Sequence, residues 1–150
     1  MRLTTDRRYD FPLSAGEFWA RIGQVDHYQR WWPWLHEFDG QALRAGDVWQ
    51  CEVHPPAPYV VRFSVALEQV IVDKSVTARI SGDIEGTAAL HIWDEASGCT
   101  VRLQSALAPA KQSLRFMSIV ARPVLRFGHN WILDAGVRQF RTSPGPPSRA

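Results

Sequence analysis

The chain has 150 residues, a formal net charge of +2 and an apolar content of 45%, which together fit one globular domain with a single core. The small net charge, with arginines spread from Arg2 to Arg149, argues against a nucleic-acid partner. The opening residues are polar and charged, unlike a secretion signal, and no uncharged apolar run reaches the roughly 18 residues of a membrane helix. We therefore expect a cytoplasmic protein without integral membrane association.

The chain begins with an expected strand over 3–11 and a short helix. In the segment "LSAGEFWARI", Ser14 and Glu17 have the spacing of a capping box. Leu13 and Phe18 have the spacing of a hydrophobic staple, which is a second signal for a helix start. These two local patterns predict that a helix begins immediately after Ser14.

A second short helix is expected to begin at Asp26 and to end at Trp32, because Pro33 disfavours helical geometry in the residue before it. It leads into "YQRWWPWLHEF" at 28–38, which holds three tryptophans, a tyrosine and a phenylalanine. Aromatic side chains of this size fill a core, wall a small-molecule pocket or form a patch for a partner protein. The pattern leaves the first two interpretations equally open and favours the third less.

The middle of the chain changes to a period of two. Apolar and polar residues alternate in "GDVWQCEV", "PYVVRFSVAL", "VTARISG", "IEGTAALHIW" and "CTVRLQSAL". Alternation with one wet face is typical of antiparallel strands, and the breaks between the segments are short enough for hairpins. We expect about six strands after the helices, and therefore about seven strands in total.

The last expected element is a long helix from Leu114 to about Phe140, with a kink or break near Arg122 because Pro123 removes an amide donor. The segment "TSPGPPSRA" that follows is rich in proline, serine and glycine. We expect one domain over 1–141 and a disordered tail over 142–150.

Arg115, Arg122 and Arg126 share a second stripe of this helix. A solvated helix face is the simpler interpretation of the stripe. Contact with anionic lipid headgroups is the alternative.

The order of strand, two short helices, antiparallel strands and one long closing helix resembles the START-like, Bet v 1-like (SRPBCC) superfamily, and within it the polyketide cyclase/dehydrase group. The resemblance covers roughly residues 3–140 and is carried by "FPLSAGEFWARI", "DHYQRWWPWL", "GDVWQCEV", "PPAPYVVRF", "ISGDIEGTAAL" and "RPVLRFGHNWILDAG". It implies an α+β helix-grip fold, in which a curved antiparallel sheet of about seven strands wraps around a long C-terminal helix. It also implies a cavity between sheet and helix, which we expect to measure at least about 300 Å³.

The expected cavity would be lined by the inward strand face, by the long helix and, near its mouth, by the aromatic stretch. The residues assigned to this lining are Trp31, Trp32, Leu35, Trp49, Cys51, Tyr59, Val61, Phe63, Ile80, Leu90, Val101, Leu103, Leu114, Met117, Ala121, Leu125, His129 and Ile132.

Few polar residues offer chemistry in such a cavity. His129 beside the apolar stripe of the helix is a candidate general acid or base, and Tyr59 could orient a ligand through its hydroxyl. A structural role is the simpler interpretation of both. Asp83 and Glu85 are close in sequence, but at a hairpin Asp83 is better suited to accepting backbone hydrogen bonds.

The histidines and the isolated cysteines Cys51 and Cys99 lack the spacing of common metal motifs, so we expect no metal site and no cofactor. The expected function is binding of a hydrophobic or aromatic small molecule, lipid-like or polyketide-like. The alternative is an enzyme of the polyketide cyclase, aromatase or dehydratase type that uses the same cavity. The pattern specifies neither the ligand nor the oligomeric state.

Overall fold

The computed structural model describes residues 2–142. The predicted tail lies outside this part of the chain, except for Thr142, which belongs to the last helix. The bounds of the helices and strands are β1 Leu3–Phe11, α1 Ala15–Ile22, the 3-10 helix η1 Val25–His27, α2 Tyr28–Trp31, β2 Leu35–Asp39, β3 Val48–Val53, β4 Val61–Ile71, β5 Ser75–Gly82, β6 Ile84–Glu95, β7 Gly98–Pro109, α3 Gln112–Val120 and α4 Arg122–Thr142.

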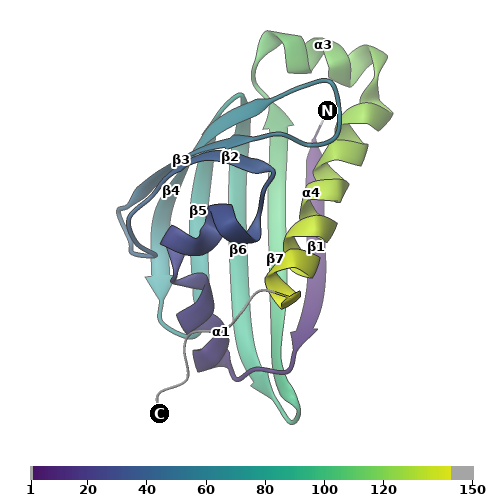
Figure 1. Cartoon of the computed structure of the whole chain (residues 1–150). Helices are drawn as coiled ribbons and strands as arrows, with labels where there is room; N and C mark the ends of the chain where they lie inside the picture. Colours follow the sequence, from purple (N-terminus) through teal and green to yellow (C-terminus); the bar gives the residue numbers. More distant parts are fainter. Residues whose placement is uncertain (1, 143–150) are drawn as a thin grey trace.

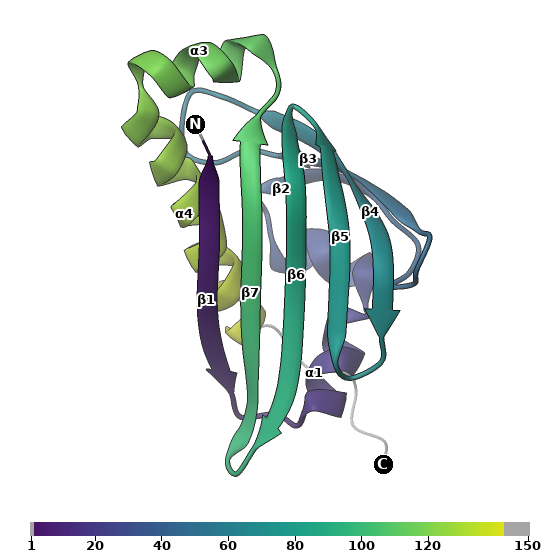
Figure 2. The same ribbon diagram turned by 180° about the vertical axis from the view of Figure 1, so that it is seen from behind.

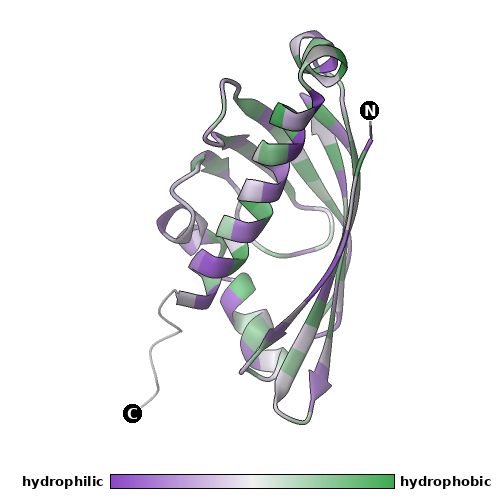
Figure 3. Cartoon of the chain, turned by 90° about the vertical axis from the view of Figure 1, so that its right-hand side faces the viewer, coloured by the Kyte–Doolittle hydropathy of each residue, from purple (hydrophilic) through white to green (hydrophobic). Residues whose placement is uncertain are grey.

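The seven strands form one antiparallel sheet in the order β1-β7-β6-β5-β4-β3-β2 (Figures 1 and 2). Strands β2 to β7 follow one another as a meander, and β1 closes the order by pairing with β7, from Leu3 opposite Leu107 to Phe11 opposite Cys99. The sheet curves, and α4 lies on its concave side (Figure 3). The predicted fold, a curved sheet of about seven strands around a long C-terminal helix, is therefore confirmed.

The alternation of the sequence decides which sheet face is buried. In β5, Val76, Ala78 and Ile80 are buried, whereas Arg79 between the last two is exposed. Successive side chains of a strand point to opposite faces, so the apolar set covers the concave face and the polar set meets solvent. The same alternation in the neighbouring strands produces a continuous apolar surface opposite α4.

The short helices close one end of the sheet. Ser14 caps α1, because its Oγ accepts the backbone N–H of Glu17 at 3.1 Å, as the capping-box spacing predicts. Phe18 of α1 packs on Phe11 of β1 and Phe140 of α4, with ring centroids 5.0 and 5.3 Å away. These contacts hold α1 against the first strand and the last helix turn.

The C-terminal helical region is broken, as Pro123 predicts. Helix α3 ends at Val120, Ala121 has non-helical dihedrals (φ −141°, ψ 45°), and α4 begins at Arg122. Pro123 therefore stands in the first turn of α4, where its missing amide costs little. The long helical region expected from Leu114 to Phe140 is thus divided at the expected break: α3 lies across the end of the sheet, and only α4 follows its concave face (Figure 1). Neither α3 nor α4 combines the length and apolarity required to cross a membrane, nor does another helix within 2–142.

Candidate functional site

Two adjoining cavities lie between the concave face of the sheet and α4. We call the first, of about 350 Å³, the aromatic lobe; it is lined by Tyr9, Phe11, Phe18, Ile22, Tyr28, Trp32, Leu43, Trp49, Val65, Leu67, Val76, Ala78, Ala88, Ala89, Leu90, Val101, Leu103, Gly136, Val137 and Phe140. We call the second, of about 300 Å³, the Tyr59 lobe; it is lined by Leu3, Trp34, Val53, Pro55, Tyr59, Val61, Phe63, Ile80, Ile84, Ala88, Leu103, Ser105, Leu107, Ala108, Pro109, Leu114, Leu125, Gly128, His129, Ile132 and Leu133.

The two lobes share Ala88 of β6 and Leu103 of β7, so these side chains form a waist between them. The space between sheet and helix is therefore not filled by side chains, and each lobe reaches the lower end of the usual size range of ligand pockets. Nearly all of the lining is aliphatic or aromatic. Such a lining favours an apolar ligand that is oriented by few polar contacts.

Most of the side chains that the sequence assigns to the pocket line one of the lobes. They are Trp32, Trp49, Tyr59, Val61, Phe63, Ile80, Leu90, Val101, Leu103, Leu114, Leu125, His129 and Ile132.

The other five assigned residues lie elsewhere. Trp31 and Leu35 are buried in the core without lining either lobe. Cys51 packs against the core without lining either lobe, and it also borders a groove formed with residues of β2, β3 and β4. Met117 belongs to α3 and Ala121 to the break after it, and the direction of α3 removes both from the lining.

The tryptophans of the aromatic stretch have different roles. Trp31 fills the core, because only 7% of it is exposed and its ring lies nearly perpendicular to that of Phe140, with the ring centroids 5.5 Å apart. Trp32 lines the aromatic lobe and donates its indole N–H to the Gly136 carbonyl of α4 at 2.9 Å. Trp34, which the sequence reasoning did not assign, lines the Tyr59 lobe and donates to Gln139 Oε1 at 2.9 Å. Core filling and pocket lining are thus both realised within one short stretch.

Tyr59 is held against α4 at a glycine. Its hydroxyl donates to the Leu125 carbonyl at 3.4 Å. A Cβ added at Gly128 would lie 1.9 Å from the Tyr59 hydroxyl oxygen. Only a glycine at this helix position leaves room for the phenol. Burial raises the pKa of Tyr59, so the phenol is protonated at neutral pH; its oxygen can accept a hydrogen bond from a ligand, or its O–H can exchange the long bond to Leu125 for one to the ligand.

His129 lines the same lobe from the next position of α4. Burial lowers the pKa of His129, the hydrogen bond with Asn130 opposes this shift, and the charge of Arg7 adds to it. Arg7 is itself held by Asp134 at 2.6 Å. The imidazole is therefore neutral at pH 7, and it can accept a proton or a hydrogen bond from a ligand.

Two tyrosines of the aromatic lobe were missed by the sequence reasoning. The Tyr9 hydroxyl is shielded from solvent and lies near the Arg7 guanidinium without a hydrogen bond of standard geometry. Tyr28 donates its hydroxyl to the Ile22 carbonyl, and burial raises its pKa. The alternation of 3–11 places Tyr9 on the face of Phe11 and could have indicated it.

Comparison with known proteins gives similarity in structure alone. No family model matches the sequence, and no curated protein matches it. Norcoclaurine synthase from Thalictrum flavum, solved in complex with dopamine and hydroxybenzaldehyde, aligns with a TM-score of 0.64 and 10% identity over 97% of this chain and 90% of that chain. The di-domain aromatase/cyclase BexL from the BE-7585A biosynthetic pathway aligns at 0.71 and 10% identity over 93% of this chain and 49% of that chain. Ara h 8.0201 aligns at 0.62 and 8% identity over 95% and 100%.

This chain has the Bet v 1-like helix-grip fold. Helix α3 forms an exposed corner of the molecule, where Phe116 and Ile119 are 64% and 82% exposed and Phe127 in the second turn of α4 is 54% exposed. Arg115, Arg122 and Arg126 are exposed at the same corner. The stripe is therefore accessible to solvent, and the lipid-contact interpretation stays a prediction.

Asp83, at the hairpin between β5 and β6, has a structural role. Asp83 accepts the backbone N–H of Arg62 through its carboxylate at 2.8 Å, as the turn interpretation predicts. Its carbonyl accepts the amides of Ala110 and Lys111 at 2.8 and 3.0 Å. These bonds tie the β5–β6 turn to the end of β7.

Proposed function

We propose that this chain binds an elongated hydrophobic or aromatic small molecule, lipid-like or polyketide-like, across the aromatic lobe and the Tyr59 lobe. The observation that carries the proposal is the pair of adjoining apolar cavities of about 350 and 300 Å³. The Tyr59 hydroxyl, the His129 imidazole and the Tyr9 hydroxyl are the groups that would orient the ligand. Structural neighbours solved with aromatic compounds or described as aromatase/cyclases are consistent with this use of the fold.

The waist provides the test. Ala88→Leu adds three carbons between the lobes, so a ligand that spans both should lose at least tenfold in affinity. The matched control is Thr87→Leu, the exposed neighbour of Ala88 on the opposite face of β6. The apolar dye 1-anilinonaphthalene-8-sulfonate serves as the probe, and native mass spectrometry of the purified protein identifies any retained molecule.

Loss of dye binding in Ala88→Leu and its retention in Thr87→Leu would support the proposal. Equal dye binding by the native protein and Ala88→Leu would overturn it. Thermal melting of both variants separates occlusion from misfolding, because a filled waist leaves the melting temperature near or above the native value.

An enzyme of the cyclase, aromatase or dehydratase type is the second candidate, because a neutral imidazole and a protonated phenol face one lobe. Such a pair can remove and donate protons. His129→Gln should then abolish turnover of an aromatic polyketide that the native protein converts, at unchanged dye affinity. Unchanged turnover would exclude His129 as a catalytic residue and leave the binding role.

A further inference from the structure

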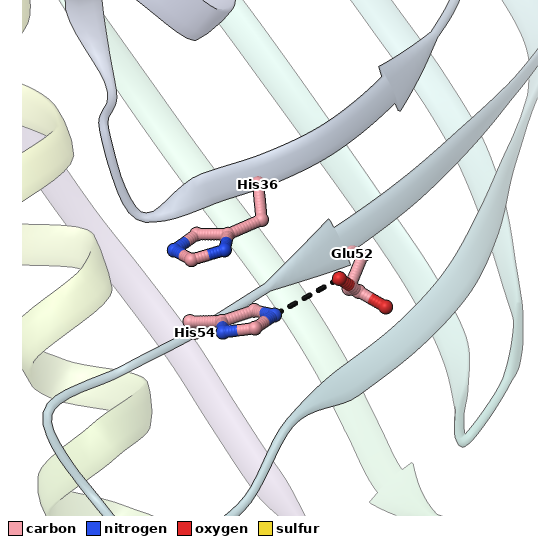
Figure 4. A group of neighbouring side chains, drawn as sticks. All are labelled: His36, Glu52 and His54. Atoms are coloured by element: carbon pink, nitrogen blue, oxygen red, sulfur yellow. Dashed lines mark hydrogen bonds and ion pairs between the residues drawn. The ribbon is translucent and has the colours of Figure 1, made fainter.

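Three side chains that are separated in the sequence meet at the end of β2 and β3 that is near α4. Glu52 and His54 stand two residues apart on β3 and just after it, and therefore on one face. Leu35 pairs with Val53 while Glu37 pairs with Glu52, so His36 is the extra residue of a β-bulge. Bulges redirect a side chain, and this one places His36 over His54 (Figure 4). One ligand atom from each of His36, Glu52 and His54 lies within 4.8 Å of the other two.

Glu52 is a charged acceptor in a shielded position. It is 8% exposed, and its two carboxylate oxygens have different partners: Oε1 receives Arg62 Nε at 2.5 Å and Oε2 meets His54 Nε2 at 2.9 Å. The hydrogen bond from His54 lowers the pKa of Glu52, burial opposes this shift, and Arg62 adds to it. The carboxylate is therefore ionised at neutral pH, with one oxygen oriented by Arg62 and the other directed at an imidazole.

The two imidazoles are stacked face to face. Their ring centroids are 3.5 Å apart and their planes differ by 8°. His54 Nε2 lies 2.9 Å from Glu52 Oε2, and His36 is the exposed ring of the stacked pair.

We propose that His36, Glu52 and His54 form a binding site for a divalent transition-metal cation of the zinc type. The cation would replace the proton between His54 Nε2 and Glu52 Oε2, and His36 would supply the third ligand. Two imidazole nitrogens and one carboxylate oxygen suit zinc, whereas magnesium and calcium prefer oxygen ligands alone. Arg62 keeps its bond to Oε1 and acts as the outer partner that orients the ligating carboxylate.

The site needs only a side-chain movement to close. The ligand atoms of His36, Glu52 and His54 lie within 4.8 Å of one another, whereas ligand atoms around a tetrahedral zinc ion are about 3.4 Å apart. The three side chains must therefore move closer together to bind one ion. Each imidazole lone pair lies in the plane of its ring, so the stacked rings must rotate apart to aim at one ion. His36 is exposed, and water would complete the coordination on the solvent side. His54 also precedes Pro55, a lining residue of the Tyr59 lobe, so the cation would stiffen the rim of that cavity.

Calorimetric titration of the full chain with zinc chloride, and separately with magnesium chloride, tests the proposal. We expect one zinc per chain, no magnesium binding, and a zinc affinity that falls at least tenfold in His36→Asn and in Glu52→Gln. His91→Asn, which changes an exposed histidine of β6, is the matched control and should bind zinc as the native chain does. Lowering the pH from 7.5 to 5.5 should weaken binding, because protons compete for the imidazoles.

The Glu52→Gln variant separates the proposed site from a pair of surface histidines. Native zinc affinity in Glu52→Gln, or an equal loss in His91→Asn, would overturn the proposal, as would the absence of zinc binding at 100 µM. X-ray absorption at the zinc edge should show two imidazoles per zinc in the native chain and one in His36→Asn. Far-ultraviolet circular dichroism of each variant confirms that the chain is folded when zinc is added.

Discussion

Two glycines of α4 allow a sharp test of how Tyr59 meets the helix. An alanine inside a helix is favoured over glycine by about 1 kcal/mol. At Gly136 an added Cβ would have Trp34 Cζ2 as its nearest atom at 3.5 Å, which is an ordinary contact. Gly136→Ala should therefore raise the free energy of unfolding by about 1 kcal/mol.

At Gly128 the same substitution is opposed by a clash. The added Cβ would lie 1.9 Å from Tyr59 Oη, 2.9 Å from Tyr59 Cζ and 3.3 Å from Pro55 Cβ. The phenol must retreat by about 1.5 Å, and overpacking of this kind costs about 1–3 kcal/mol, which exceeds the helical gain. Gly128→Ala should therefore lower the free energy of unfolding by about 1 kcal/mol, so that the two alanine variants differ by about 2 kcal/mol.

Urea denaturation of Gly128→Ala, Gly136→Ala, Tyr59→Phe and the double variant Gly128→Ala/Tyr59→Phe gives the required energies. Removal of Oη relieves the shortest contact, so the double variant should be more stable than the sum of the two single changes predicts, by about 1 kcal/mol. Equal stabilisation by both alanines would show that Tyr59 does not pack on Gly128, and would remove Tyr59 from the lining of its lobe.

Titration and thiol chemistry provide two further predictions. The pKa of His129 lies below its ordinary value of 6.5 in the folded chain, so the unfolded state binds more protons and stability falls as the pH drops through 6.5 toward the folded pKa. His129→Gln should lose less stability between pH 7.5 and 5.5 than the native chain in urea titrations, and an identical loss would contradict the shift. Burial raises the pKa of Cys51 to about 12 and also raises that of Cys99, so Ellman's reagent at pH 8 should label both thiols in urea and neither in the folded chain. Rapid labelling of the folded chain would show that these sites open.

Local patterns predicted the elements because their causes are local. Ser14 caps a helix through a partner three residues away, and Pro123 breaks a helix through its own missing amide. The alternation of the strands likewise assigns the inward face of the sheet residue by residue, and Val61 and Leu103 of that face line the Tyr59 lobe.

Features that depend on distant segments could not be predicted in this way. A break near Arg122 was expected, but the direction of α3 follows from dihedrals that the sequence does not specify, and Met117 packs against the core without lining either lobe. Trp31 and Trp32 are adjacent in sequence, yet only the docking of α4 decides which of them faces the cavity. His36 and Glu52 are distant in sequence and come together through a bulge in the pairing of β2 with β3. The spacing of histidines in the sequence does not indicate such a bulge.

The pairing of the first strand with the last has a consequence for the way the chain folds during synthesis. Strand β1 is made before the other strands, but its partner β7 begins only at Gly98, and α4, which covers the concave face, is made after all seven strands. Loop closure over such a distance slows folding, and sheets rich in long-range pairs fold in about milliseconds to seconds rather than microseconds. Until Phe140 emerges, the apolar face of the meander is uncovered and exposed to aggregation, so a chain truncated before α4 should need a chaperone to stay in solution.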